Sequence, residues 1–238
     1  MMRFKMRLLL LSFLLLTSPL AAAERIAIYY PTTHEVRDIQ KTLGGDPALS
    51  GITANAFARF EDFTFSLGSD PYEFAILPSV LPRYLPEFEP VFQFTLGNAK
   101  SFKYSIISID SKWDKAKLAT GVGGMVDEVG RKNIKLYVES LMAGQKFKRI
   151  KQVGKVIDLF PMLSLGNVDY IVISPRDLEH LKKEFTTRTY KVVDTIEVNY
   201  PVLCIKNGYD KKKAQKFERI SKATLSALGF DGIVEIEK

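Results

Sequence analysis

Asp70-Pro-Tyr-Glu-Phe-Ala-Ile-Leu-Pro78 is the stretch of sequence on which the fold prediction rests. Its apolar centre, Phe74 to Leu77, predicts a short buried strand, and Ser79 is well placed to cap a brief helix that reaches Tyr84. Short apolar runs that alternate with helix-compatible segments are typical of a sheet covered by helices. This stretch therefore predicts one β-α step of an α/β fold.

The same alternation continues on both sides of this stretch. Strands are predicted at 25–30, 52–60 and 90–96, and helical segments at 33–43 and 61–67. Together these segments predict a β-α-β-α-β unit, the pattern of a mostly parallel sheet flanked by helices.

The pattern restarts after Gly97-Asn98, which indicates a second lobe. Ser174 at the N-cap and Pro175 at the first helical position give a strong helix-start signal. Two crossings between the lobes, near 97–102 and 186–195, would form a hinge beside a ligand cleft. The remaining predicted elements are strands at 104–109, 117–122, 147–153, 168–174 and 233–236, an extended segment at 190–205, and helices at 126–142, 156–165, 176–185 and 210–228.

The N-terminal segment has the pattern of a secretory signal. Three positive charges in the first seven residues precede an apolar stretch at 8–16 and the small residues Ala21-Ala22-Ala23. The apolar stretch is shorter than the ~18 residues that a membrane span needs. An uncleaved anchor is the alternative, and a lipid anchor is not indicated, because no cysteine directly follows the cleavage site. We expect cleavage near Ala23 and a periplasmic protein, with a first lobe formed by 24–100 and 192–238 and a second by 101–191.

Charge and residue usage narrow the classes of function. The predicted signal contributes +3 of the formal +7, so the mature chain would carry a mild +4. Lys211-Lys212-Lys213 is interpreted as a solvated helix face, and no nucleic-acid partner is expected. Cys204, the one cysteine, lies in an apolar strand and predicts a buried, inert thiol. His34 and His180 lack metal-ligand spacing, so neither a metal site nor a cofactor is expected.

Three runs carry a resemblance to a known family: Tyr72-Glu-Phe-Ala-Ile-Leu-Pro78, Leu85-Pro-Glu-Phe-Glu-Pro-Val91 and Lys103-Tyr-Ser-Ile-Ile107. They resemble the first-lobe and crossover signature of type 2 periplasmic binding proteins, above all the phosphate- and phosphonate-binding components of ABC importers. Leu163-Ser-Leu-Gly-Asn-Val-Asp-Tyr-Ile-Val172 is similar to an element that these proteins place late in the second lobe. The resemblance covers nearly all of the mature chain. It implies a two-lobed α/β fold, each lobe a mixed, mostly parallel sheet flanked by helices, with the ligand cleft between the lobes.

Such a receptor would bind its ligand at the carboxyl ends of the strands. Helix N-termini point there, and their free N–H groups and partial positive charge favour anions. Tyr30 and Tyr104 are candidates for stacking on the ligand or hydrogen-bonding to it from the cleft walls. The candidate ligand-binding residues are Tyr30, Thr32, Thr33, His34, Ser79, Tyr104, Gly123, Gly124, Ser174 and Arg176.

Each candidate also has an ordinary structural interpretation. The hydroxyls of the threonines and of Ser79 are good helix caps without a ligand, and His34 is equally compatible with an exposed surface position. The glycines at 121–124 resemble a phosphate-binding nest, yet a glycine-rich turn between a strand and a helix is common. Arg176 could hold a carboxylate or phosphate with two hydrogen bonds, or be solvated in a first helical turn.

One departure from the family bears on the ligand. The stretch 121–127 has no hydroxyl group and ends in an acidic residue, where phosphonate-binding members carry serine or threonine. A doubly charged phosphonate is therefore disfavoured, and a carboxylate, an amino acid or an amine-bearing solute would suit Asp127 and Glu128 as well. These two residues are alternatively ordinary first-turn acids that complement a helix dipole.

The sequence as a whole predicts a periplasmic solute-binding protein. We expect a monomer that captures a small anionic ligand, phosphate-like, phosphonate-like or carboxylate, by hinge closure and delivers it to an ABC-type importer. No Gly-x-Ser-x-Gly or His-Glu-x-x-His spacing appears, so no enzyme is expected. The alternative is a ligand-sensing or accessory protein that presents the same two lobes to a membrane permease, a sensor kinase or another protein partner without transport.

Overall fold

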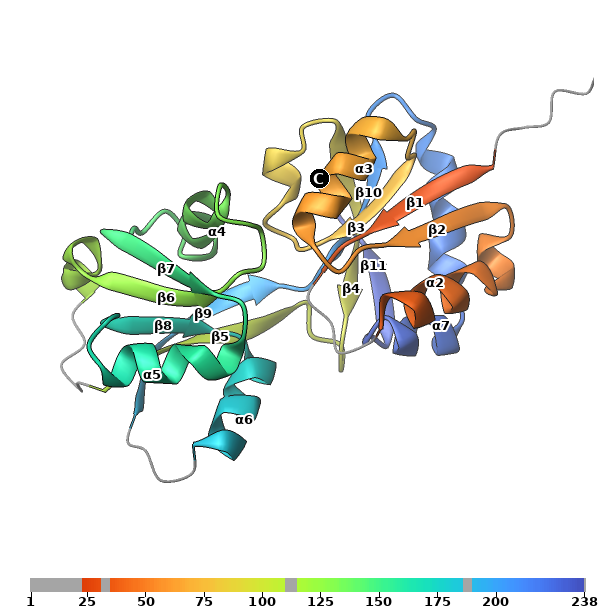
Figure 1. The fold of residues 1–238 in the computed structure, drawn as a ribbon. Helices are drawn as coiled ribbons and strands as arrows, with labels where there is room; N and C mark the ends of the chain where they lie inside the picture. The colour runs from red at the N-terminus through yellow and green to blue at the C-terminus, as the bar shows by residue number, and fades with distance from the viewer. Residues whose placement is uncertain (1–22, 31–34, 110–114, 186–189, 238) are drawn as a thin grey trace, which may run out of the picture.

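The computed structural model describes residues 23–30, 35–109, 115–185 and 190–237. They form two lobes, each built on one sheet with helices against it (Figure 1). Residues 1–22 of the predicted signal and the segment 31–34 lie outside the described residues. Within the described part of the chain, none of the helices is long and apolar enough to cross a membrane.

The first lobe contains a six-stranded sheet in the order β11-β4-β10-β3-β1-β2. Parallel pairing is confined to β1, β2 and β3, and the pairs that involve β10 and β11 are antiparallel. The strands are β1 (Glu24–Ile28), β2 (Ile52–Ala56), β3 (Phe74–Leu77), β4 (Phe88–Thr95), β10 (Val202–Lys206) and β11 (Gly232–Glu235). The helices are α2 (Val36–Gly44), α3 (Phe60–Ser69) and α7 (Lys222–Ala227), with 3-10 turns η1 (Pro47–Leu49), η2 (Pro82–Tyr84) and η5 (Lys211–Arg219).

The second lobe contains a five-stranded sheet in the order β7-β6-β8-β5-β9. Strands β7, β6 and β8 are parallel, and β5 runs antiparallel to β8 and β9. The strands are β5 (Ser101–Ser108), β6 (Val122–Val126), β7 (Arg149–Val153), β8 (Tyr170–Ile173) and β9 (Lys191–Asn199). The helices are α4 (Ile134–Leu141), α5 (Leu159–Ser164) and α6 (Pro175–Glu184), with 3-10 turns η3 (Lys115–Thr120) and η4 (Val156–Asp158).

The predicted α/β class and the mixed sheets are confirmed, although fewer strand pairs are parallel than expected. The strand predicted at Phe74 to Leu77 has those bounds in the structure. The strand predicted at 117–122 was wrong, because η3 occupies most of it. The glycine-rich turn predicted at 121–125 and the helix start predicted at 126 were also wrong, because β6 runs through this segment and α4 begins at Ile134.

The glycines of β6 lie in the strand because large neighbours pack against them. A Cβ atom added at Gly123 would lie 2.9 Å from the Phe147 ring, and one at Gly124 would lie 3.3 Å from the Val168 side chain. Both glycines are buried. Their small size, rather than a turn conformation, explains glycine here, and the strand assignment follows from packing that the local sequence does not reveal.

We expect Gly123→Ala to lower the free energy of unfolding by about 1–3 kcal/mol, because the methyl group would force the buried Phe147 ring to move. Gly154→Ala is the matched control, since an added Cβ there meets nothing within 4 Å. Equilibrium urea denaturation of both variants measures the difference. Equal stability of the two variants would contradict the close approach at Gly123.

The two lobes are connected at two adjacent crossings. The first, between β4 and β5, lies where the sequence predicted it. The second was predicted near 186–195 but lies at Tyr200 and Pro201, because β9 pairs with β5 along its length. Residues 192–199, assigned above to the first lobe, therefore run in the sheet of the second. Backbone hydrogen bonds tie the crossings together, from Tyr200 N to Lys100 O at 3.0 Å and from Phe94 N to Pro201 O at 3.1 Å.

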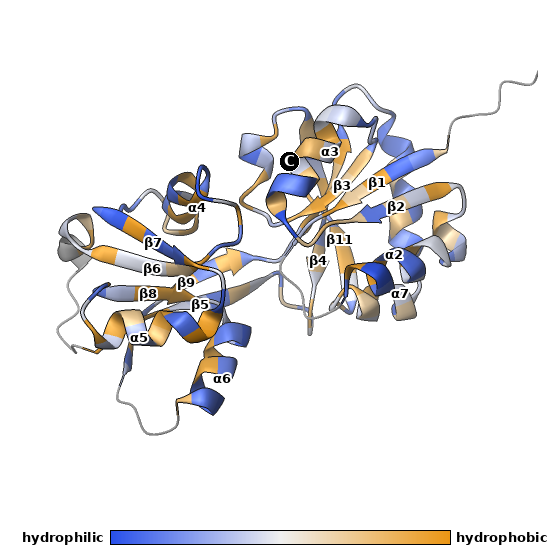
Figure 2. Cartoon of the chain, in the orientation of Figure 1, coloured by the Kyte–Doolittle hydropathy of each residue, from blue (hydrophilic) through white to orange (hydrophobic). Residues whose placement is uncertain are grey.

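Alternating side chains divide the core into layers. In β3, Phe74 and Ile76 face one apolar cluster, while Ala75 and Leu77 face another. The second of these clusters also contains Tyr104 and other residues of the second lobe, so apolar contact continues from one lobe to the other. A third cluster lies on the opposite face of the second sheet. Hydrophobic residues concentrate accordingly in the strands, and the helices show mixed faces (Figure 2).

The long helix predicted at 210–228 is broken in two. Segment η5 ends before Ile220, and α7 begins after Ser221, whose side chain accepts a hydrogen bond from the Thr224 backbone N–H. Asp46, in the loop that follows α2, fixes this break, because its carboxylate accepts hydrogen bonds from Ser221 N and from Thr224 Oγ1. A tertiary contact therefore overrides the helical pattern.

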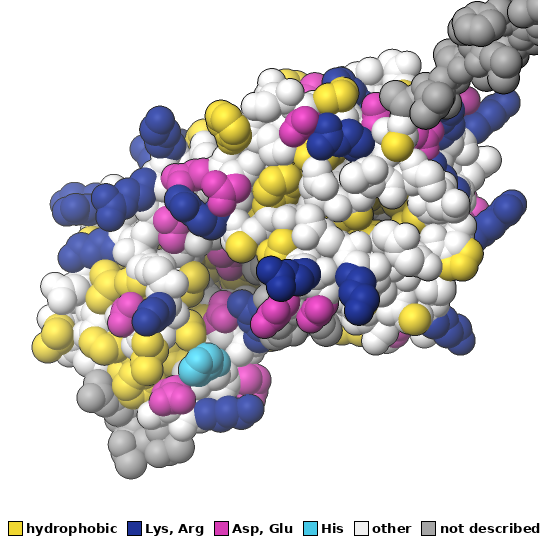
Figure 3. All heavy atoms as spheres, turned by 45° about the vertical axis from the view of Figure 1, so that its right-hand side comes forward, with side chains coloured by type: hydrophobic (Ala, Val, Ile, Leu, Met, Phe, Trp, Pro, Cys, Tyr) yellow, Lys and Arg dark blue, Asp and Glu magenta, His cyan; other side chains and the backbone are white. Residues whose placement is uncertain are grey.

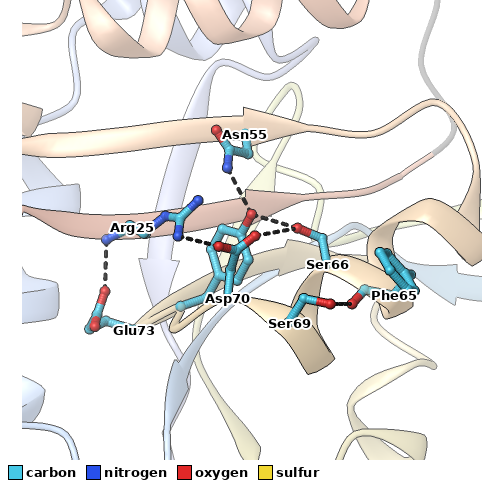
Figure 4. Close-up of polar contacts among 8 residues, drawn as sticks. Arg25, Asn55, Phe65, Ser66, Ser69, Asp70 and Glu73 are labelled. Atoms are coloured by element: carbon cyan, nitrogen blue, oxygen red, sulfur yellow. Dashed lines mark hydrogen bonds and ion pairs between the residues drawn. The ribbon is translucent and has the colours of Figure 1, made fainter.

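A polar cluster holds the amino end of β1, opposite the cleft between the lobes. Arg25 Nη1 donates to Asp70 Oδ1 at 2.7 Å, and Arg25 N donates to Glu73 Oε2 at 2.7 Å (Figure 4). The guanidinium also lies over the Tyr72 ring, 4.9 Å from its centroid. The Tyr72 hydroxyl and the Asn55 side chain share a hydrogen bond of 2.7 Å. These contacts fix the register of the strands that lead to the cleft.

Basic side chains gather at the outer edge of the second lobe, around the edge strand β7 (Figure 3). Glu139 is the only acidic residue between 131 and 155. Charged side chains on an edge strand oppose pairing with another sheet, which is a sufficient explanation for this group. The exposed basic residues are Arg131, Lys132, Lys135, Lys146, Lys148, Arg149 and Lys155.

Candidate functional site

A cavity of about 320 Å³ lies between the lobes. It is bounded by residues that follow the parallel strands β1 and β3 in the first lobe and β8 in the second. In α/β proteins, ligands commonly bind at the carboxyl ends of such strands. The two crossings form its inner wall. The lining residues are Tyr30, Pro78, Leu96, Phe102, Tyr104, Tyr137, Ser174, Pro175, Arg176, Val198, Asn199, Tyr200, Pro201, Leu228, Gly229 and Phe230.

The first lobe supplies an aromatic wall. The Tyr30 hydroxyl donates to Leu228 O at 2.6 Å, which ties the end of β1 to the turn after α7. Gly229, with φ +85°, ends that helix: its N–H bonds to Ser226 O at 2.9 Å and Phe230 N bonds to Leu225 O at 2.9 Å. This pairing is a Schellman motif, for which glycine is favoured. It turns the chain so that Phe230 lines the cavity.

The crossings supply further rings. Phe102 and Tyr200 stack with their centroids 5.0 Å apart and their planes at 29°. Tyr200 also meets Phe230 edge-on at 5.6 Å, and Phe102 lies 5.5 Å from Tyr104. The rings of Tyr30 and Phe230 are 5.8 Å apart. The aromatic wall is therefore continuous from the first lobe, through the crossings, to the second.

The second lobe supplies the charged group. Ser174 caps α6 by accepting from Asp177 N at 3.1 Å, and its hydroxyl donates to Asp177 Oδ2 at 2.9 Å. The predicted helix start is thereby confirmed. The Arg176 guanidinium contacts Asp177 Oδ1 through Nε and Nη2, both at 3.3 Å, and its side chain is 47% exposed. Arg176 therefore presents donors to the cavity, held in place by a neighbouring carboxylate.

A buried carboxyl group lies behind this part of the cavity. Glu128, 8% exposed, accepts hydrogen bonds from the Tyr137 hydroxyl at 2.6 Å and, more weakly, from the Tyr104 hydroxyl at 3.2 Å. The pKa of Glu128 is raised to about 7: burial is the largest cause and nearby Asp177 acts in the same direction, while the two tyrosine hydroxyls and Arg176 act in the opposite direction. Burial also raises the pKa of both tyrosines. At neutral pH this carboxyl group is near the midpoint of its titration.

Hydrogen bonds also join the facing surfaces of the two lobes, a boundary called the seam below. They show that the lobes are closed on one another. The Tyr29 hydroxyl of the first lobe donates to the Glu128 backbone oxygen. On the same seam, the Tyr84 hydroxyl donates to Leu136 O at 2.9 Å, and Arg83 Nη1 donates to Ser140 Oγ at 3.3 Å. Opening the cleft would have to break these bonds.

Four of the predicted ligand-binding residues are brought together. Tyr30, Tyr104, Ser174 and Arg176 all line the cavity. The other predicted residues are placed elsewhere or are not described. Ser79 donates to Asn199 O at 2.8 Å and so braces the second crossing. Gly123 and Gly124 lie in the buried middle of β6, away from the lining, and Thr32, Thr33 and His34 lie outside the described residues.

Most of the aromatic wall and the burial of Glu128 were not predicted from the sequence. Glu128 was considered as an acidic group near the ligand or as a first-turn residue, and its burial was not expected because β6 was not recognised as a strand. Phe230 had a usable signal, since Leu228-Gly229 after a helical segment predicts a helix stop that sets the direction of the next residue. Phe102, Tyr137 and Tyr200 had none, because they meet only through the fold.

A further prediction concerns a reactive group. Cys204 is completely buried, as predicted, and burial raises the pKa of its thiol, which favours the unreactive protonated form. Among the residues that the structure describes, no group of three histidine, cysteine, aspartate or glutamate side chains could share a metal ion.

Comparisons with known proteins agree on the fold. No protein-family model and no curated protein sequence matches this chain. A structure of XAC2383 from Xanthomonas citri bound to ATP superposes with a TM-score of 0.66 at 10% identity, covering 91% of this chain and 92% of that one. A binding protein of an ABC phosphonate transporter from Pseudomonas aeruginosa gives 0.53 at 14%, covering 90% and 81%. The periplasmic VFT2 domain of BvgS from Bordetella pertussis gives 0.50 at 12%, covering 87% and 92%.

These likenesses confirm the two-lobed fold that the sequence resemblance implied. Periplasmic solute-binding proteins are among the structures that share it. At 10–14% identity the comparison concerns the fold alone.

Proposed function

We propose that this chain is a periplasmic solute-binding protein that closes on a small anionic ligand and does no covalent chemistry. The observation that carries the proposal is the cavity between the lobes, with Arg176 at the start of α6 facing it. A guanidinium beside a helix N-terminus favours an anion, because the cation and the peptide dipoles act in the same direction. The structural similarity to the binding protein of an ABC phosphonate transporter supports a role in delivery to an ABC-type importer.

The same arrangement supports hinge closure. The lobes are joined by two extended crossings, and the bonds from Tyr29 and Tyr84 lie across the seam rather than within a lobe. Opening the cavity would break these bonds and separate the apolar contact between the lobes, while the hydrogen bonds within each sheet could stay intact. A ligand that contacts both walls would favour the closed form by its differential affinity for the two states.

A sensing role is the second candidate. The likeness to the periplasmic VFT2 domain of BvgS favours it, because that domain has the same two-lobed fold. The two roles share the cavity and differ in the protein that reads the closed form. Copurification with a membrane permease, as opposed to a membrane sensor, separates them.

A thermal-shift screen of residues 24–238 against phosphate, phosphonates, carboxylates, amino acids, polyamines and sugars tests ligand binding. We expect a saturable rise in melting temperature with an anionic class, equivalent to ~2.7 kcal/mol at a hundredfold excess over Kd. Arg176→Gln should weaken that binding about 10- to 100-fold, because a charge-assisted hydrogen bond is lost. Arg219→Gln, an exposed arginine on η5, is the matched control. A cooperatively folded protein that responds to no class would contradict the proposal.

A further inference from the structure

The walls of the cavity carry more aromatic surface than the binding of a simple anion requires. Six of the 16 lining residues that the structure describes are tyrosine or phenylalanine. Burying an anion such as inorganic phosphate against such walls would remove its water without replacing the hydrogen bonds. The residues present therefore favour a ligand with an apolar or aromatic body.

The aromatic wall has the geometry to receive a flat ring. Phe102 and Tyr200 stack nearly parallel, and Phe230 meets Tyr200 edge-on. Aromatic groups prefer such offset-stacked and edge-on arrangements, so an added ring can extend the same array. The cavity of about 320 Å³ lies at the lower end of the ~300–1,000 Å³ range of small-molecule sites, which indicates a compact ligand.

The charge in the cavity is small and local. Arg176 is the one lysine or arginine among the described lining residues, and its Nη1 has no hydrogen-bond partner among the described residues. Asp177 and the buried Glu128 lie close to it, so the net positive charge available to a ligand is at most about one unit. This balance favours one anionic group over several.

We propose, on the premise that the cavity is the ligand site of a solute-binding protein, that its ligand is a flat aromatic or heteroaromatic ring carrying one anionic group. The ring lies against the wall formed by Phe102 and Tyr200, and the anionic group accepts hydrogen bonds from Arg176. A carboxylate on an aromatic ring and a phosphate ester of a nucleoside share this chemistry.

Isothermal titration calorimetry with five probes tests the ligand class: benzoate, cyclohexanecarboxylate, acetate, inorganic phosphate and adenosine monophosphate. We expect benzoate to bind at least about tenfold more tightly than cyclohexanecarboxylate, or adenosine monophosphate at least about tenfold more tightly than inorganic phosphate, because only the flat rings can stack. The probe that binds identifies whether the anionic group is a carboxylate or a phosphate ester. Proton NMR should show its ring protons shifted upfield by the protein rings.

Two variants locate the ring in the cavity. Phe102→Leu and Tyr200→Leu keep an apolar side chain and remove the aromatic face, so each should weaken the ring-bearing probe about tenfold and leave acetate unchanged. Phe65→Leu is the matched control, because Phe65 lies on α3 with 77% of its surface exposed. Melting curves of all three show whether the fold is kept, and either cavity variant suffices for the test.

The outcomes separate this inference from the proposed function. Equal binding of each ring-bearing probe and its ringless partner, or tight binding of only an aliphatic solute, overturns the inference and leaves a solute-binding protein. The absence of binding by these probes and by every class in the thermal-shift screen overturns both.

Discussion

A Phe74→Ala protein is expected to unfold with a free energy about 3–5 kcal/mol lower than the wild type. Phe74 is the first residue of β3 and is fully buried. Its ring meets Phe217 at 5.0 Å and Tyr209 at 5.7 Å, and the Lys216 ammonium lies 5.3 Å from its centroid. Truncation would leave a cavity between the central strand of the first lobe and the segment η5, which these contacts hold to the sheet.

Equilibrium denaturation in urea, followed by circular dichroism, measures this loss. Phe65→Ala is the control, because that ring is 77% exposed and its truncation should change stability by about 0.5 kcal/mol or less. If the two variants lost the same amount, the central position of Phe74 in the first lobe would be refuted.

Glu128→Gln is expected to be more stable than the wild type at pH 8 by about 3 kcal/mol and nearly equal to it at pH 4.5. Burial raises the pKa of Glu128 to about 7 in the folded protein, against 4.5 for the unperturbed group. Below pH 4.5 the group is protonated in both states. Between pH 4.5 and 7 the unfolded chain releases the proton and the folded protein keeps it, so the wild type loses stability as pH rises. Glutamine keeps an oxygen acceptor for Tyr137 and removes this loss.

Denaturation curves of both proteins from pH 4.5 to 8 give the difference in unfolding free energy between them as a function of pH. The titration of other groups affects both proteins equally and cancels in this difference. Tyr137→Phe removes a hydroxyl whose hydrogen bond lowers the pKa of Glu128, so in that variant the loss of stability should still begin near pH 4.5 but continue to higher pH than in the wild type. A pH-independent difference between Glu128→Gln and the wild type would show that the carboxyl group is solvated in the folded protein.

Much of the architecture was predictable because local patterns and tertiary structure agree. The apolar run at Phe74 to Leu77 and the Ser174-Pro175 helix start both occur where the residues indicate. Local patterns failed where a distant contact decides the outcome. Glycines at 123 and 124 disfavour a strand by themselves, yet the Phe147 ring leaves no room for a side chain at 123, and Val168 packs closely against 124.

The candidate site was only partly predictable for the same reason. Tyr30, Ser174 and Arg176 lie within three residues of the carboxyl ends of β1 and β8, so the rule that ligands lie at the carboxyl ends of strands finds them. Phe102 and Tyr137 come from β5 and α4, and Tyr200 comes from the second crossing; the fold places all three in the lining of the cavity. No spacing in the sequence encodes that shared position.

The return of the chain to the first lobe has a consequence for how the protein is made. Every strand of the second sheet lies between residues 101 and 199, so that sheet is contiguous along the chain. In the first sheet, β3 and β4 are separated by β10, and Val202 pairs with Leu77. During synthesis the earlier-made lobe must therefore wait for its central strand, while the later-made lobe can fold as a unit. The order of folding is the reverse of the order of emergence, and an incomplete first sheet remains exposed until the last strands arrive.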